Sequence, residues 1–201
     1  MQLIEIFFSI QGEGPAMGRP ATFVRLAGCN LRCKGCDTDL QPGRELSLSE
    51  VIEGVKGHRA VITGGEPTLQ MDELSQLISL LHSRKKEVDI ETNGTNPIGE
   101  EVLKKVHYAV VSPKRGSNFH LEYWAARENV HLKFVLGKEP WCWTAPLIEQ
   151  MISGHPLAKE RIWIMAYGAE QDMQGAKEAW DLALSLGVNY SDRLHIRLMR
   201  R

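Results

Sequence analysis

The stretch Cys29-Asn30-Leu31-Arg32-Cys33-Lys34-Gly35-Cys36 places three thiols within eight residues, separated by three and then two positions. Thiolates at this spacing can converge on one inorganic cluster. A cubane iron–sulfur cluster usually takes four thiolates, so three cysteines leave one iron open to another ligand. The polar and cationic residues between the thiols favour their deprotonated form. We therefore expect Cys29, Cys33 and Cys36 to bind a metal cluster.

Other uses of these cysteines are open on the spacing alone. A structural zinc ion would need a fourth ligand such as His58 or His82, and zinc usually binds paired Cys-x-x-Cys knuckles. Cys33 and Cys36 could form a redox pair, or the three thiols could be unrelated and buried. A disulfide scaffold is disfavoured, because 201 residues can bury a core without covalent staples.

The composition is that of an ordinary globular protein. The 201 residues have a mass of 22.6 kDa, and 43% are hydrophobic and 24% charged, so we expect a single domain over residues 1–201. The net charge of −1 offers no basic field for nucleic acid. Neither a bilayer-spanning apolar run nor a basic signal region is apparent, so we expect no membrane association and a cytoplasmic location, where thiols stay reduced.

Strand and helix patterns alternate along the chain. Strands are expected at residues 3–10, 21–27, 58–63, 87–90, 108–111, 129–136, 161–165 and 194–198, and helices at 48–55, 69–83, 98–106, 146–152 and 171–186. In the second helix, residues 74, 77, 78 and 81 form an apolar stripe that would face a core. The alternation predicts an α/β fold, an open, partial (β/α)6-type barrel, because a full eight-unit barrel takes about 250 residues.

Polar and glycine-rich loops follow several of these strands, at the end where α/β folds bind ligands. Gly64 and Gly65 expose main-chain groups, and Glu66 can accept a hydrogen bond from an ammonium group. The segment Gln11-Gly12-Glu13-Gly14 could bind a ligand through its main chain and a polar side chain, or it could be a plain turn.

Charged and oxygen-bearing residues flank the cysteine motif. Arg25 lies among apolar strand residues, so it needs an anionic partner, either a structural carboxylate or a substrate carboxylate. Asp37, Thr38 and Asp39 offer oxygen ligands of the kind that Mg²⁺ prefers, and the same residues also suit an ordinary turn. Arg25 and the segment 37–39 are therefore candidates for the same site as the cysteines.

Together with a second motif, the cysteine motif resembles the radical S-adenosylmethionine (SAM) superfamily. The second motif is Val61-Ile62-Thr63-Gly64-Gly65-Glu66-Pro67, an apolar strand that ends in Gly-Gly-Glu-Pro. In that superfamily the open iron of a 4Fe-4S cluster is bound by the amino and carboxylate groups of SAM. The resemblance implies a barrel of the radical SAM kind, with a SAM site beside the cysteine loop.

Further motifs resemble one family of that superfamily, the 7-carboxy-7-deazaguanine synthases, from the first strand to about residue 140. They are Ser9-x-Gln11-Gly12-Glu13-Gly14, Phe23-Val24-Arg25-Leu26-x-Gly28-Cys29-Asn30-Leu31, Cys36-Asp37-Thr38, Glu91-Thr92-Asn93-Gly94-Thr95 and Ser112-Pro113-Lys114. The resemblance implies a lyase of queuosine-type deazapurine biosynthesis. It would convert 6-carboxy-5,6,7,8-tetrahydropterin to 7-carboxy-7-deazaguanine with loss of ammonia, through a 5′-deoxyadenosyl radical that takes hydrogen from C6.

The same resemblance implies roles for individual residues. Cys29, Cys33 and Cys36 would bind the cluster, and Thr38 would bind Mg²⁺. The SAM contacts would be Gly35, Cys36, Asp37, Gly65, Glu66, Ser112, Pro113 and Lys114, and the substrate contacts Ile10, Gln11, Gly12, Arg25 and Thr63. Arg25, Thr38 and Glu66 would serve catalysis, in part because Mg²⁺ and Arg25 would neutralise the pterin carboxylate beside the reacting carbon.

Partners and departures follow from the same comparison. The resemblance implies an electron donor such as flavodoxin or ferredoxin, and a homodimer. A proline commonly follows the methionine of the late strand in this family, whereas this chain has Met165-Ala166-Tyr167-Gly168. Cys142, between two tryptophans, is expected to be a packed thiol, and His195 is a candidate substrate contact.

Two alternative functions share some of these features. An activase that makes a glycyl radical on a partner protein, such as the anaerobic ribonucleotide reductase activator, has the same cysteine spacing in a short chain. It does not account for Gln11-Gly12-Glu13-Gly14, Arg25 and Thr38 together. A zinc-stabilised binding module is the alternative outside enzymes.

Overall fold

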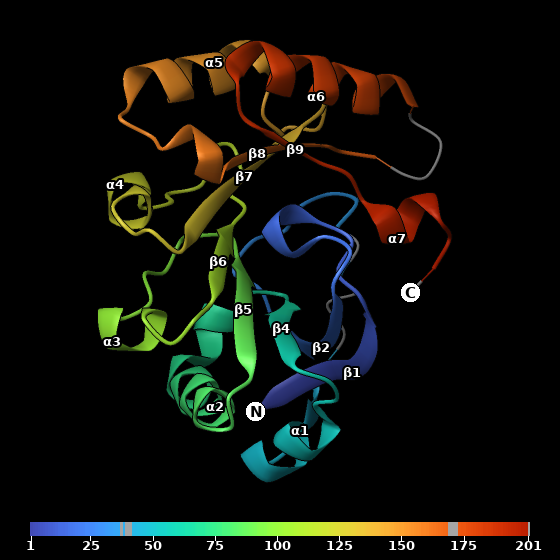
Figure 1. The fold of residues 1–201 in the computed structure, drawn as a ribbon, viewed down its shortest axis with the longest axis vertical. Helices are drawn as coiled ribbons and strands as arrows, with labels where there is room; N and C mark the ends of the chain where they lie inside the picture. The colour runs from blue at the N-terminus through green and yellow to red at the C-terminus, as the bar shows by residue number, and fades with distance from the viewer. Residues whose placement is uncertain (37, 39–41, 169–172, 201) are drawn as a thin grey trace.

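In the computed structural model, which describes residues 1–36, 38, 42–168 and 173–200, helices cover the outer side of one curved sheet (Figure 1). The described strands form a nine-stranded sheet in the order β3-β1-β2-β4-β5-β6-β7-β8-β9. Their bounds are β1 Gln2–Ile10, β2 Pro20–Leu26, β3 Arg44–Glu45, β4 Arg59–Gly64, β5 Glu87–Thr92, β6 Tyr108–Val111, β7 Val130–Leu136, β8 Ile162–Ala166 and β9 Asn189–Ser191. The helices are α1 Leu48–Gly54, α2 Met71–Ser83, α3 Glu100–Leu103, α4 Leu121–Ala125, α5 Ala145–Gly154, α6 Met173–Leu186 and α7 Leu194–Arg197, with 3-10 turns at Gly14–Ala16, Pro67–Gln70 and Lys159–Arg161.

The connections give the sheet its directions. From β2 through β4 to β9 every neighbouring pair is parallel, and a helix lies between each strand and the next. β1 is antiparallel to β2, because the loop at residues 11–19 is too short for a parallel crossover. The structure thus confirms the predicted α/β fold, an open, partial barrel built from β/α units.

Successive residues of the central strands face opposite sides of the sheet. Ile62 of β4 belongs to the same buried cluster as the α2 stripe at residues 74, 77, 78 and 81, which the sequence predicted. The next residue, Thr63, and its counterpart Glu91 of β5 face the inner side and line a cavity. The outer face of the sheet therefore carries the main core, and the inner face carries the site.

The predicted final strand at residues 194–198 is wrong. These residues form the short helix α7, in which the Leu198 amide donates to the Leu194 carbonyl at 2.9 Å. Apolar and polar residues that alternate over only five positions also place Leu194 and Leu198 on one helical face. β9 already pairs with β8, and Arg197 Nε lies 3.0 Å from both carboxylate oxygens of Asp192, which stabilises the turn.

Smaller differences concern short elements. α4, β3 and β9 were not predicted from the sequence, and the helix expected at residues 98–106 is confined to α3. α6 begins at Met173, while residues 171 and 172 of the predicted helix lie outside the described residues. Short segments carry too few periodic positions to be distinguished from loops.

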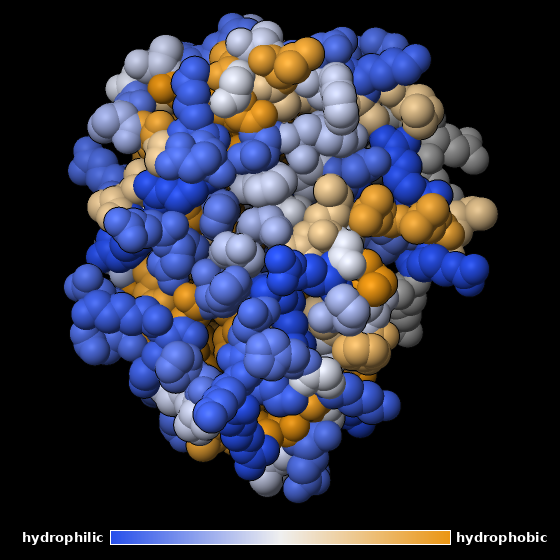
Figure 2. Space-filling model, viewed as in Figure 1, coloured by the Kyte–Doolittle hydropathy of each residue, from blue (hydrophilic) through white to orange (hydrophobic). Residues whose placement is uncertain are grey.

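The face of the molecule in Figure 2 is mainly hydrophilic. Apolar side chains gather on it around α7, where Leu198 and Met199 are exposed. In the part of the chain that the structure describes, no helix is both long enough and apolar enough to cross a membrane.

The α2 helix provides a matched test of this core. Leu77 is fully buried, whereas Leu80 on the same helix is 39% exposed. We expect Leu77→Ala to lower the free energy of unfolding by about 2–5 kcal/mol, because it removes buried methyl groups and leaves a cavity. Leu80→Ala, the control, should cost less than about 1 kcal/mol. Urea denaturation measures both, and equal losses would contradict this packing.

Candidate active site

A cavity of about 620 Å³ lies on the inner side of the sheet. Its lining includes most of the predicted site residues, namely Ile10, Gln11, Gly12, Arg25, Cys29, Cys33, Gly35, Cys36, Thr38, Thr63, Gly65, Ser112 and Lys114. Among the described residues that were predicted for the site, Glu66 and Pro113 do not line it. The predicted SAM contact Asp37, and the neighbouring Asp39, lie outside the described residues.

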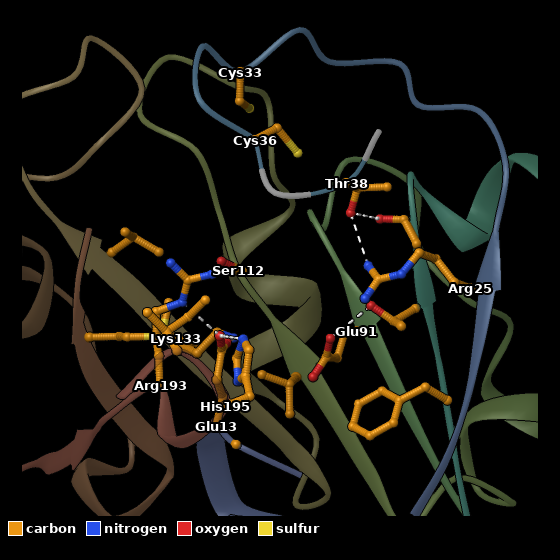
Figure 3. A pocket seen from close by; sticks show the side chains of 18 of the residues that line it. Glu13, Arg25, Cys33, Cys36, Thr38, Glu91, Ser112, Lys133, Arg193 and His195 are labelled. Carbon is orange, nitrogen blue, oxygen red and sulfur yellow. Dashed lines mark hydrogen bonds and ion pairs between the residues drawn. The ribbon is translucent and has the colours of Figure 1, made fainter. Parts of the chain in front are cut away.

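The three thiols of the cysteine loop are free and border the cavity. Figure 3 shows Cys33 and Cys36 on the same loop, at the end of the cavity where Thr38 also lies. Burial raises the pKa of the Cys33 thiol, and the nearby Lys114 ammonium opposes that rise. Within residues 1–36, 38, 42–168 and 173–200, no three His, Cys, Asp or Glu side chains form a site for a single metal ion. An iron–sulfur cluster instead can bind each thiolate through a different iron.

Glycine permits the close packing at the base of the cysteine loop. A Cβ atom on Gly65 would lie 1.7 Å from the Gly28 carbonyl oxygen, so no other residue fits there without a backbone shift. The Gly65 amide donates to the Leu26 carbonyl at 3.0 Å, and the Glu66 amide donates to the Gly28 carbonyl at 2.7 Å. The residues that follow β4 thus hold the main chain at residues 26–28, where the cysteine loop begins.

Glu66 is enclosed between the loops that follow β4 and β5, and its contact with SAM stays a prediction. Its side chain is fully buried, and its carboxylate accepts hydrogen bonds from the amide and hydroxyl of Thr68, the Thr92 hydroxyl and the Asn93 amide. Three of these bonds go to one carboxylate oxygen and one to the other, and the residue does not line the cavity. Glu66 therefore connects the β4 and β5 loops, which gives it a positioning role.

Arg25 and Thr38 meet on one side of the cavity (Figure 3). Arg25 Nε lies 3.0 Å from the Glu5 carboxylate, directly across the β1–β2 pair, and Arg25 Nη1 donates to the Thr38 hydroxyl at 3.0 Å. The Thr38 hydroxyl donates to the Gly64 carbonyl at 3.2 Å. Arg25 thus pairs with a structural carboxylate while its guanidinium borders the cavity, so the two partners expected from the sequence are compatible.

Glu91 lies between the two sides of the cavity in Figure 3. One carboxylate oxygen accepts from the Thr63 hydroxyl at 2.8 Å, and the other accepts from the Gln11 side-chain amide at 3.0 Å. Two predicted substrate contacts therefore orient a third polar residue. A carboxylate has more than two acceptor positions, so Glu91 can still accept a ligand N–H group.

The opposite side carries a buried charge cluster around Glu13 (Figure 3). Its carboxylate forms ion pairs with Lys133 of β7 and with Arg193, whose Nε lies at 3.1 Å, and His195 Nε2 lies at 4.0 Å. Burial alone would raise the pKa of Glu13, but the charges of Lys133 and Arg193 outweigh it and lower the pKa to about 2. Glu13 is therefore ionised at neutral pH.

Sequence reasoning missed Lys133, Glu91 and Arg193 as members of the site. Lys133 interrupts the apolar strand 130–136, the same signal that singled out Arg25, so it could have been found. Arg193 lies directly before the segment 194–198 that was wrongly predicted as a strand, and its place beside Glu13 had no local signal. Cys142 is confirmed as a packed thiol: it is fully buried, and burial raises its pKa to about 11.

Comparison with known proteins agrees with this geometry. Residues 24–123 match the radical SAM superfamily. The chain is 36% identical to a 7-carboxy-7-deazaguanine synthase from Hyperthermus butylicus, over 98% of this chain and 92% of that protein. The chain belongs to the 7-carboxy-7-deazaguanine synthase family of radical SAM enzymes. Its relatives include a synthase from Methanospirillum hungatei that is 38% identical over 85% of this chain and 74% of that protein.

A solved structure, QueE from Escherichia coli, has the same fold. It matches with a TM-score of 0.73 at 21% identity, over 96% of this chain and 94% of that chain. Membership of the synthase family implies a 4Fe-4S cluster and SAM. The chain's own residues fit both groups, because three free thiols border one cavity and Gly35 and Gly65 line it without side chains.

The Glu13 cluster predicts a pH dependence of stability. The pKa of Glu13 is lowered from 4.5 to about 2 on folding. Its stabilising contribution is therefore complete above pH 4.5 and is lost as the pH falls towards 2, by about 3 kcal/mol in all. Glu13→Gln should lower the stability at pH 7 and flatten this part of the profile.

Urea denaturation from pH 2 to 7 measures the effect, and Glu53→Gln, at an exposed position of α1, is the matched control. A Glu13→Gln profile parallel to that of the unmodified chain would show that Glu13 carries no such linkage.

Proposed function

We propose that this chain converts 6-carboxy-5,6,7,8-tetrahydropterin to 7-carboxy-7-deazaguanine with loss of ammonia, a step of queuosine-type deazapurine biosynthesis. The observation that carries the proposal is one cavity lined by the cysteine loop, by Arg25 and by Glu91. Relatives named for this product match over nearly the whole chain. They do not favour the glycyl-radical activase considered as an alternative.

The residues supply two kinds of substrate contact. When bound, the cluster and SAM supply the one-electron chemistry that starts a radical reaction. Arg25, oriented by Glu5, offers a cation to the substrate carboxylate. Glu91, fixed by Gln11 and Thr63, offers an acceptor to the N–H edge of the pterin ring. Contacts at both ends of the substrate would limit which C–H bond meets the radical.

Thr38 is the proposed Mg²⁺ ligand. Its hydroxyl oxygen donates to Gly64 and accepts from Arg25, which leaves one lone pair for a cation. Mg²⁺ takes few protein ligands and keeps several waters or substrate oxygens, so one threonine is sufficient from the chain. Thr38 would hold the ion, which would supply positive charge for the substrate carboxylate in addition to that of Arg25.

The proposal includes expectations about the surroundings of the enzyme. An exposed or partly exposed cysteine loop needs a reducing compartment, which supports a cytoplasmic location. Reduction of the cluster requires a one-electron donor, which we infer to be a protein such as flavodoxin or ferredoxin. We also infer a homodimer and a single domain over residues 1–201.

Anaerobic turnover tests the proposed reaction. The reconstituted chain is incubated with a reductant, SAM and carboxytetrahydropterin, and the products are separated by mass. We expect 7-carboxy-7-deazaguanine and ammonia in equal amounts. SAM cleavage without any deazapurine would keep the radical SAM chemistry and rule out this substrate.

Substitution of Thr38 tests the metal. Thr38→Ser keeps the hydroxyl, whereas Thr38→Val keeps the shape and removes the ligand oxygen. We expect Thr38→Val to lower the Mg²⁺-stimulated rate at least about 10-fold, which corresponds to about 1.4 kcal/mol, with the iron content unchanged. Thr38→Ser should retain most of the stimulation. Rates measured against Mg²⁺ concentration decide, and equal stimulation in both variants would exclude Thr38 as the ligand.

A further inference from the structure

The segment Trp141-Cys142-Trp143 connects loops that lie far apart in the sequence. The Trp141 indole Nε1–H donates to the Lys34 carbonyl at 3.0 Å, across 107 positions of chain. The Trp143 indole donates to the Pro113 carbonyl at 2.7 Å. One tryptophan therefore contacts the cysteine loop, and the other contacts the 112–114 loop.

Trp141 also contacts the remaining loops around this end of the cavity. The Lys114 ammonium lies 5.4 Å from the centroid of its ring, and the Tyr167 ring packs edge-on at 5.1 Å. The Arg115 amide donates to the Trp141 carbonyl at 2.9 Å. The loops after β6, β7 and β8 thus meet at one indole, and that indole lines the cavity.

The other end of this connection is rigid. Trp143 is buried, its ring packs against Phe134 at 5.1 Å, and it forms a β-bridge with Leu136 at the end of β7. Because Trp143 belongs to the core, the adjacent Trp141 has a fixed position relative to the sheet. The hydrogen bond from Trp141 to Lys34 therefore connects the cysteine loop to the core through Trp143.

The second half of the cysteine loop has few other connections in the described part of the chain. The first half is connected through Asn30, which exchanges hydrogen bonds with Asn93 and Thr95 at 2.9 and 2.8 Å. In the second half, the Lys34 ammonium lies 3.8 Å from Glu139, but it is 84% exposed, so this pair contributes little. Tyr167 also packs against this half, because a Cβ atom on Gly35 would lie 2.0 Å from its hydroxyl oxygen. Among the described residues, the indole bond to the Lys34 carbonyl is the hydrogen bond that links residues 33–36 to another loop.

We propose that Trp141 is a positioning residue for the cofactor site, because it aligns the Cys33–Cys36 half of the cysteine loop with the 112–114 loop. This inference rests on the proposed function only in taking the ligand to be a cluster with SAM. A misaligned loop would still carry three thiols, so the cluster would form. SAM would bind more weakly, because the SAM contacts that the family resemblance implies lie on both loops.

Trp141→Phe isolates the hydrogen bond. Phenylalanine keeps an aromatic ring beside Lys114 and Tyr167, removes the N–H donor to Lys34, and is smaller than the indole, a loss of size that the control variant shares. Trp180→Phe is the matched control, because Trp180 lies on α6, is 57% exposed and does not line the cavity. Both variants are reconstituted with iron and sulfide under anaerobic conditions, reduced, and titrated with SAM without pterin.

The change that SAM causes in the electron paramagnetic resonance spectrum of the reduced cluster measures binding. We expect Trp141→Phe to contain as much iron as the unmodified chain, and its dissociation constant for SAM to rise about 3- to 10-fold, as for the loss of one hydrogen bond. Trp180→Phe should titrate like the unmodified chain. An unchanged constant in Trp141→Phe, or an equal rise in both variants, would overturn the assignment.

Amide hydrogen exchange of the cluster-free chain gives a second readout. Faster exchange in Trp141→Phe that is confined to residues 29–36 and 112–116 supports positioning. Faster exchange across the whole sheet, or none in residues 29–36, would contradict it. Because neither measurement contains pterin, both remain valid if the turnover assay finds no deazapurine.

Discussion

The ion pairs of Glu13 connect the two ends of an open sheet. β1 and β9 lie near opposite edges and do not pair, so a partial barrel has no backbone ladder across its gap. Glu13 follows β1, and its carboxylate binds Lys133 of β7 and Arg193 after β9. The Gly14 amide donates to the buried Ser191 hydroxyl at 2.9 Å, and the Leu194 amide donates to the Gly12 carbonyl. Ion pairs between side chains, together with individual hydrogen bonds from the main chain of the loops, thus perform the closure that hydrogen-bonded strands provide in a complete barrel.

The side chains on the inner face of the sheet differ between the amino ends and the carboxyl ends of the parallel strands. At the amino ends of the parallel strands, Arg59 pairs with the buried Asp89 and lies over the Tyr108 ring, next to which His131 packs. These large side chains pack against one another and fill that end. Towards the carboxyl ends the inward residues are smaller or paired along the wall, as with Thr63, and a cavity results. The position of the site follows from this gradient of side-chain size.

The sequence predicted the features that repeat or that lie close together in the chain. The apolar period of α2 and the cysteine spacing each involve residues within about fifteen positions, over which the local backbone conformation sets how side chains are placed. Each strand and helix of the β/α alternation was likewise recognised from its own short segment. The contacts of Arg25 were left as two alternatives, because a strand pattern shows that a charge needs a partner without showing which one. Glu5, its partner, lies twenty positions earlier and directly across the β1–β2 register.

The residues that were missed depend on topology. Arg193 reaches Glu13 across 180 positions, and Trp141 reaches a main-chain carbonyl across 107, so neither contact has a local pattern in the sequence. The charges of Arg193 and Glu13 are complementary, but nothing in the sequence selects this pair, and the Trp141 contact has no charge to suggest it. An indole N–H can donate to any carbonyl that the fold brings near, and sequence gives no reason to select Lys34. Motifs therefore identify residues that bind a cofactor directly, whereas residues that align its loops become visible only once the strands are placed. Glu66 belongs to a motif and also has a contact that the sequence did not show, because its carboxylate accepts hydrogen bonds from Thr92 and Asn93 of the next loop.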